Sequence, residues 1–86
     1  MIEQLVKCFK DSDETIRELA SRGIMQVACV ERGREYIVKH RIVTDVAALF
    51  EDQVVKIRSN AYHTLLRLAD FLYGIDSTID FDLNII

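Results

Sequence analysis

The sequence contains no proline and no tryptophan, and only three of its 86 residues are glycine. A protein built from β-strands needs many tight turns, and glycine and proline are the residues that form them most readily. Their scarcity argues against an all-β fold and favours helices joined by short connections. A chain of this length forms at most one small domain.

Long apolar runs are also missing. The sequence has no stretch of about 18 apolar residues and no basic N-terminal region followed by an apolar run, so it predicts neither a membrane span nor a signal peptide. Cys8 and Cys29 are the only cysteines, and both fall at apolar positions of the pattern. We expect buried free thiols in a reducing compartment, which indicates a cytoplasmic protein.

Positive charge is in short supply as well. The net charge of −3 argues against a general nucleic-acid binder, which usually carries a basic surplus. The most basic stretch, residues 32–41, contains Glu35 and lacks both a phosphate-binding glycine loop and interleaved aromatic residues. We therefore expect no nucleic-acid partner.

The sequence does contain an internal repeat. Residues 5–28 align with residues 46–69 at an offset of 41, which lies in the range of roughly 40–47 residues expected of HEAT and armadillo units. Six of the 24 aligned positions are identical: Phe9/Phe50, Asp11/Asp52, Ile16/Ile57, Arg17/Arg58, Ala20/Ala61 and Ala28/Ala69. The offset continues through Gly33/Gly74, Val38/Ile79 and Ile42/Leu83.

Apolar spacing predicts an all-α fold. We expect helices over residues 2–10, 13–30, 34–40, 42–50, 53–72 and 75–83. The buried stripe of the second helix is predicted as Ile16, Leu19, Ala20, Gly23, Ile24, Val27 and Ala28. The stripe of the fifth is predicted as Val54, Ile57, Ala61, Leu65, Leu68, Ala69 and Leu72.

Three positions carry predictions about local structure. Asp11 with Glu14 three residues later resembles a capping box at the start of a helix. Gly23, in the middle of a helix, indicates close approach of a neighbouring element. Gly33 is expected to end the same helix as a left-handed cap residue.

Residues 20–28 and 61–69 fit the apolar positions of the frame A-x-x-A-L-x-N-L-A, and in these positions they resemble the signature of the armadillo repeat. This resemblance to the armadillo/HEAT superfamily implies one right-handed α-solenoid domain over residues 1–86. Its units would be residues 1–32, lacking a first helix, residues 33–73, and the start of a third unit at 74–86. About three units are needed for stability, so we also expect exposed repeat ends and self-association.

In armadillo proteins the last helix of each unit lines a concave groove that binds extended partners. The resemblance places Arg22, Gln26, His63 and Arg67 there and implies an acidic or hydrogen-bonding protein segment as the partner. Peptide-binding armadillo repeats carry asparagine at the positions of Gln26 and Arg67 and tryptophan at those of Arg22 and His63, so this chain departs from them. Ordinary exposed side chains are the alternative interpretation.

A second likeness is to HEAT repeats. Asp11 with Arg17, and Asp52 with Arg58, repeat an Asp-x5-Arg pair before each long helix. In HEAT arrays such pairs form a ladder between adjacent units, and the resemblance implies one here. Solvated surface charges are the alternative.

The stretches DSDETIR, GREYIVKHRIV and RSNAYHTLLRLADF are similar to armadillo-type proteins of ciliary radial spokes. This narrower resemblance implies a non-catalytic scaffold in the cytoplasm or axoneme of a cilium or flagellum. The alternative is a soluble adaptor that binds an extended peptide, of the nuclear-import or catenin kind.

Nothing in the sequence favours an enzyme, a cofactor or a metal. No nucleophile–base pair or phosphate loop is present. His40 and His63 have no ligand-type residue at i+3 or i+4, and the cluster Asp76, Asp80, Asp82 lacks the central glycine of a calcium loop.

Overall fold

The computed structural model describes residues 1–73, which form helices and short connections without a strand. The helices are α1 (Ile2–Cys8), α2 (Glu14–Val27), α3 (Glu31–Lys39), α4 (Val43–Ala48), the 3-10 turn η1 (Leu49–Glu51) and α5 (Val55–Tyr73). The prediction of an all-α fold is confirmed for this part of the chain. The expected third unit at 74–86, with Gly74, Asp76, Asp80 and Asp82, lies outside the described residues.

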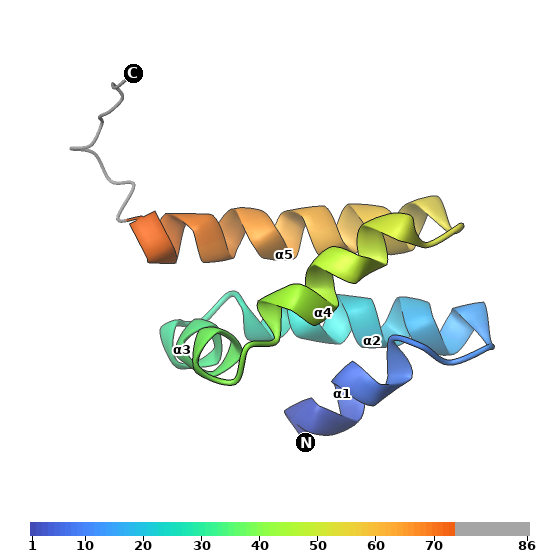
Figure 1. Ribbon diagram of the computed structural model, residues 1–86, viewed down its shortest axis with the longest axis horizontal. Coiled ribbons are helices and arrows are strands. Elements are labelled where there is room, and N and C mark those ends of the chain that lie inside the picture. Colours follow the sequence, from blue (N-terminus) through green and yellow to red (C-terminus); the bar gives the residue numbers. More distant parts are fainter. Residues whose placement is uncertain (74–86) are drawn as a thin grey trace.

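The two long helices α2 and α5 lie side by side and run in the same direction (Figure 1). Helix α1 packs against α2, and α4 crosses α5 and continues through η1 into the turn before it. Helix α3 lies at the end where α2 finishes, and it also contacts α5. Each long helix therefore has one short helical segment before it that packs on it.

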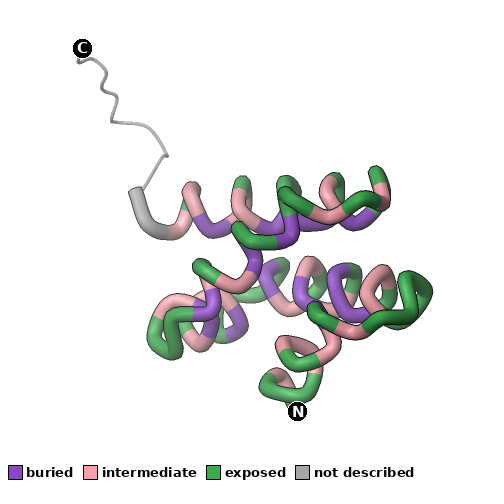
Figure 2. Tube along the Cα trace, turned by 45° about the vertical axis from the view of Figure 1, so that its right-hand side comes forward, coloured by how far each residue is buried: buried purple, intermediate pink, exposed green. Residues whose placement is uncertain are grey.

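The core lies between these helices, where the buried positions face one another (Figure 2). Burying one valine, leucine or isoleucine side chain contributes about 1.5–3 kcal/mol, so the aliphatic residues of the core supply most of the packing energy. The core consists of Phe9, Ala20, Ile24, Ala28, Ile37, Ile42, Val46, Leu49, Ile57, Ala61 and Leu68.

The start of α2 differs from the predicted capping box. The N-cap is Asp13, whose carboxylate accepts a hydrogen bond from the Thr15 backbone N–H at 2.8 Å. Asp11 instead accepts from the backbone N–H of Asp13 at 2.8 Å and forms a turn ahead of the helix. The capping-box prediction was wrong because two aspartates precede the helix. Asp13 caps it, and Asp11 forms only the turn before it.

The prediction for Gly33 was also wrong. Helix α2 ends at Val27 and α3 begins at Glu31, so Gly33 lies inside α3 rather than at a left-handed cap. A Cβ at Gly33 would lie 1.9 Å from the carbonyl oxygen of Val27, so glycine is required there by a close backbone approach. The close approach predicted at Gly23 is confirmed, since a Cβ there would lie 3.1 Å from the Leu5 side chain.

The buried face of α2 is rotated from the predicted stripe. Ile16 and Leu19 are 37% and 55% exposed, whereas Ser21 is fully buried. The prediction failed at these positions because α2 turns its Ser21 side towards α5, and the apolar period alone does not fix that rotation. Cys29 is another correction: it follows the end of α2 and is exposed, while Cys8 is half-buried, and both are free thiols.

Candidate protein interface

The turn before α2 is held by one aspartate and one arginine. The Asp11 side chain accepts from the N–H of residue 13, and its backbone carbonyl accepts from Nη1 of Arg17 at 2.8 Å. The arginine thereby joins the first turn of α2 to the middle of the connection between α1 and α2.

The turn before α5 repeats this arrangement 41 residues later. The Asp52 side chain accepts from the backbone N–H of Val54 at 3.0 Å, and the Asp52 carbonyl accepts from Nη1 of Arg58 at 2.6 Å. In both turns the aspartate side chain accepts from the backbone N–H two residues later, and the aspartate carbonyl accepts from the arginine six residues later. The sequence offset of 41 is therefore also a structural equivalence at this point.

An ion pair joins the two turns. Nε of Arg17 donates to Oδ2 of Asp52 at 2.8 Å, and Nη2 donates to Oδ1 at 3.3 Å. The two side chains are only 18% and 8% exposed, so this pair is better shielded from water than a surface salt bridge. The hydrogen bonds from Arg17 hold the pKa of the Asp52 carboxyl below its ordinary value of 3.8, although burial opposes them.

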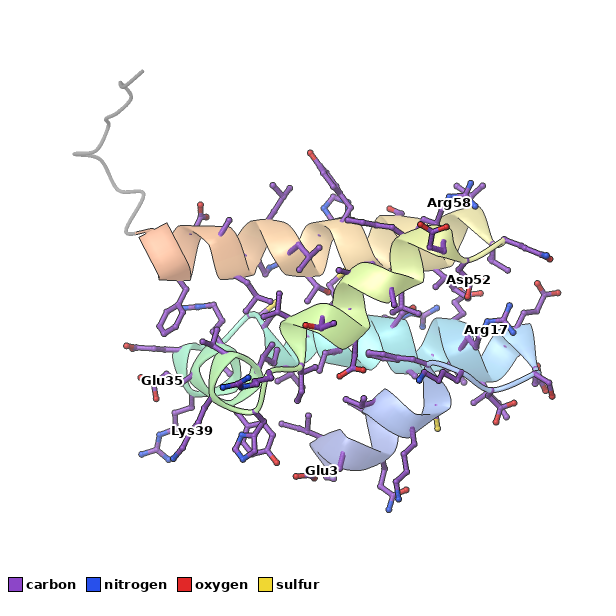
Figure 3. All side chains as sticks on the ribbon, in the orientation of Figure 1. Glu3, Arg17, Glu35, Lys39, Asp52 and Arg58 are labelled. Atoms are coloured by element: carbon purple, nitrogen blue, oxygen red, sulfur yellow. The ribbon has the colours of Figure 1, made fainter. Side chains whose placement is uncertain are left out.

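The four residues predicted to form a ladder therefore occupy unequal positions. Arg17, Asp52 and Arg58 form a row across the start of α2 and α5 (Figure 3). Within residues 1–73, Nε and Nη2 of Arg58 have no hydrogen-bond partner, and neither has Oδ2 of Asp11. The structure shows one ion pair between the two turns, while Arg58 and Asp11 keep side-chain groups that have no hydrogen-bond partner within residues 1–73.

A buried polar pair lies further along the same seam, and sequence reasoning missed it. Nδ2 of Asn60 donates to Oγ of Ser21 at 2.9 Å, and Ser21 in turn donates to the Glu18 carbonyl at 2.8 Å. Thr64 is also buried and donates to the carbonyl of Asn60 at 2.8 Å. The one signal available in the sequence was the polar pair Asn60 and Thr64, one helical turn apart on an otherwise apolar face.

The four residues predicted to line a groove lie outside the core, two on each long helix. Arg22 and Gln26 are exposed on α2, as is His63 on α5, while Arg67 is half-buried. Arg22 forms an ion pair with Glu18 at 3.2 Å, and Arg67 donates weakly to the His63 carbonyl at 3.4 Å. The strip is accessible, and Glu18 offsets part of its positive charge.

At one end of this strip, Arg67 borders a hollow of about 280 Å³. Arg34 lies over the ring of Phe71 at 5.7 Å from its centre and donates to the Ala28 carbonyl at 2.9 Å, so it is held in place. The hollow brings two arginines together with a carboxylate and an aromatic ring, and its lining residues are Cys29, Arg34, Arg67, Asp70 and Phe71.

A second polar cluster connects α1 to α3. The Tyr36 hydroxyl donates to the Glu3 carboxylate, and the Tyr36 ring stacks on His40 with 3.9 Å between centres. That hydrogen bond is the main cause that lowers the pKa of Glu3 from 4.5 to about 2, and the same bond raises the pKa of Tyr36. The hydrogen bond joins α1 to α3, and it was not predicted from the sequence.

Residues 1–73 contain no group of three or more histidine, cysteine or acidic side chains placed to hold a metal ion. In the same range, no helix has both the length and the apolar character needed to cross a membrane. Comparison with protein-family models, with curated proteins and with solved structures gives no match.

Proposed function

We propose that the chain is a non-catalytic protein-interaction module of the armadillo/HEAT type, in which about two equivalent helical units stack as a short α-solenoid. The observation that carries the proposal is the pair of aspartate–arginine turns 41 residues apart, with matching hydrogen bonds and the Arg17–Asp52 ion pair between them. A turn repeated in this detail is what stacked, related units require.

Stacked helical units give an extended surface instead of a deep pocket, and such surfaces bind extended partners. The strip formed by Arg22, Gln26, His63 and Arg67 is the part of the proposed module that receives an acidic or hydrogen-bonding protein segment. Three of these four side chains are exposed, and they lie on two parallel helices, which supports this role.

Within this class, the similarity of three sequence stretches to armadillo-type radial spoke proteins favours a scaffold of the cilium or flagellum. A soluble peptide-binding adaptor is the second candidate, and the accessible strip favours it. Imaging of the tagged protein separates the two, because a scaffold of the axoneme concentrates there and an import adaptor concentrates at or in the nucleus.

The groove is tested by reversing Arg22 and Arg67 together to glutamate. A fluorescent, extended peptide rich in glutamate serves as the probe, and its affinity is measured by fluorescence anisotropy. Two lost surface contacts of about 0.7 kcal/mol each predict binding about tenfold weaker.

The matched control is Lys7→Glu with Lys39→Glu, because both lysines are exposed and the change in net charge is the same. We expect the control to bind the peptide as the wild type does. Equal affinity of all three proteins, or no binding by the wild type, would contradict the groove assignment.

A further inference from the structure

We propose that the exposed face of α5 docks on the exposed face of α2 in a second copy of the chain, head to tail, and repeats the contact that joins α2 to α5 within one copy. The inference rests on the stacking of units in the proposed function and is independent of the groove.

Helix α2 contributes Arg17 and Ser21 to that seam. The same positions of α5, 41 residues later, are Arg58 and Tyr62. Tyr62 is 53% exposed and its neighbour Leu66 is 46% exposed, so this face of α5 is open in the described part of the chain. In the turn before α5, Phe50 is 42% exposed, whereas its equivalent Phe9 is 5% exposed.

Helix α5 contributes Asn60 to the seam, and Ile57, three residues earlier on the helix, is fully buried. Their equivalents on α2 are Ile16 and Leu19, which are 37% and 55% exposed. The molecule therefore has two open faces, one on α5 and one on α2. The open face of α5 is equivalent to the face of α2 that α5 covers. The open face of α2 is equivalent to the face of α5 that α2 covers.

The two open faces are complementary in charge. In the proposed contact, α2 of a second copy lies on α5 of the first in the way that α5 lies on α2 within one copy. This placement brings Asp11 of the second copy to Arg58 of the first, which is equivalent to the contact of Asp52 with Arg17. Nε and Nη2 of Arg58 are the atoms that Arg17 uses for this contact, and within residues 1–73 they are free. Oδ2 of Asp11 is the matching free acceptor.

The two open faces are also complementary in polarity. In the internal seam Ser21 meets Asn60, and in the proposed contact their equivalents Tyr62 and Leu19 meet. A hydrogen-bonded pair is thus replaced by an aromatic and an aliphatic side chain, which lose apolar surface to water on contact. Because the face on α5 meets a different face, on α2, the contact is heterologous and leaves one open face at each end of a dimer. Further copies can therefore bind and form a linear oligomer.

The test is the mass of the full 86-residue chain by sedimentation over a wide range of concentration. We expect the average mass of the wild type to rise continuously beyond that of a dimer. A wild type that stays monomeric, as it would if residues 74–86 covered α5, overturns the proposal, and so does association that stops at a dimer.

Charge exchange makes the test specific. Arg58→Glu places two carboxylates at the contact and Asp11→Arg places two guanidinium groups there, so each variant alone is expected to remain monomeric. In an equimolar mixture every contact again joins opposite charges, and association is expected to return. A mixture that stays monomeric overturns the pairing of these two residues.

Circular dichroism and thermal unfolding show whether each variant is folded, because both residues also hold their own turns. Tyr62→Asp is the second variant, since Tyr62 makes no hydrogen bond to another helix within residues 1–73, and it is expected to prevent association without unfolding. The Arg22→Glu, Arg67→Glu protein is expected to associate as the wild type does, so the groove and the stacking contact can fail separately.

Discussion

The molecule contains two helical modules, and one consists of α1 and α2 while the other consists of α4, η1 and α5. The modules carry identical residues at equivalent positions, but the surroundings of these residues differ. Ile57 is fully buried, whereas its equivalent Ile16 is 37% exposed. The phenylalanines differ in the opposite sense, with Phe9 buried and Phe50 exposed. Each module turns a different face to the other, so the contribution of a residue to stability depends on its side of the seam and not on its identity.

The largest expected effect comes from truncating the two equivalent isoleucines. Ile57→Ala leaves a cavity in a packed core and should lower the free energy of unfolding by about 3 kcal/mol. Ile16→Ala removes a partly solvated side chain and should cost less than about 1 kcal/mol. Urea unfolding at low protein concentration, where copies do not associate, measures both values.

Similar losses in the two variants would mean that Ile16 is covered in solution even at low concentration. The comparison of the modules would then fail, because both isoleucines would lie in equivalent packed environments. Ile57→Val is the graded control, with an expected cost of about 1 kcal/mol.

Gly33 and Gly23 both lie where another part of the chain comes close, but the neighbour of Gly33 is backbone and the neighbour of Gly23 is a side chain. Gly33→Ala forces a methyl group against the Val27 carbonyl, and we expect a loss of about 2 kcal/mol through backbone displacement. Gly23→Ala meets only the end of the Leu5 side chain, and the better helix propensity of alanine, about 1 kcal/mol, offsets the strain. Thermal unfolding of the two variants should therefore differ clearly, and equal melting temperatures would contradict this account.

The smallest expected effect is the pH dependence of the ion pair. Because the folded pKa of Asp52 is lowered, the native state binds fewer protons than the unfolded state between that pKa and the ordinary value of 3.8. The stabilisation is complete above pH 3.8 and is lost as the pH falls through the folded pKa. Asp52→Asn should thus be less stable than the wild type at neutral pH by about 1–2 kcal/mol, with a difference that shrinks in acid.

Urea unfolding at a series of pH values checks this expectation. The variant should keep part of the acid dependence, because Glu3, with a pKa of about 2, titrates in the same direction. Asp11→Asn is the matched control at the equivalent turn, where no second arginine is bonded within residues 1–73. A constant difference between wild type and Asp52→Asn at all pH values would show that the ion pair does not stabilise the fold.

Sequence reasoning reached the aspartates and arginines of the two turns because they recur at a fixed offset and because aspartate side chains accept from nearby backbone N–H groups. It assigned the cap to Asp11 in place of Asp13, since two candidates of the same type stood two residues apart. It missed the contact between Tyr36 and Glu3 entirely, because that contact joins residues 33 positions apart with no local pattern.

The sequence by itself determined the all-α character, the approximate helices and the equivalence of the two turns, because helix formation and turn chemistry depend on residues close together in the chain. Tertiary structure alone decided the rotation of α2, the burial of Ser21 against Asn60 and the need for glycine at position 33. The physical reason is that the apolar period defines a broad stripe on a helix, and only the neighbouring helix selects which edge of that stripe is buried.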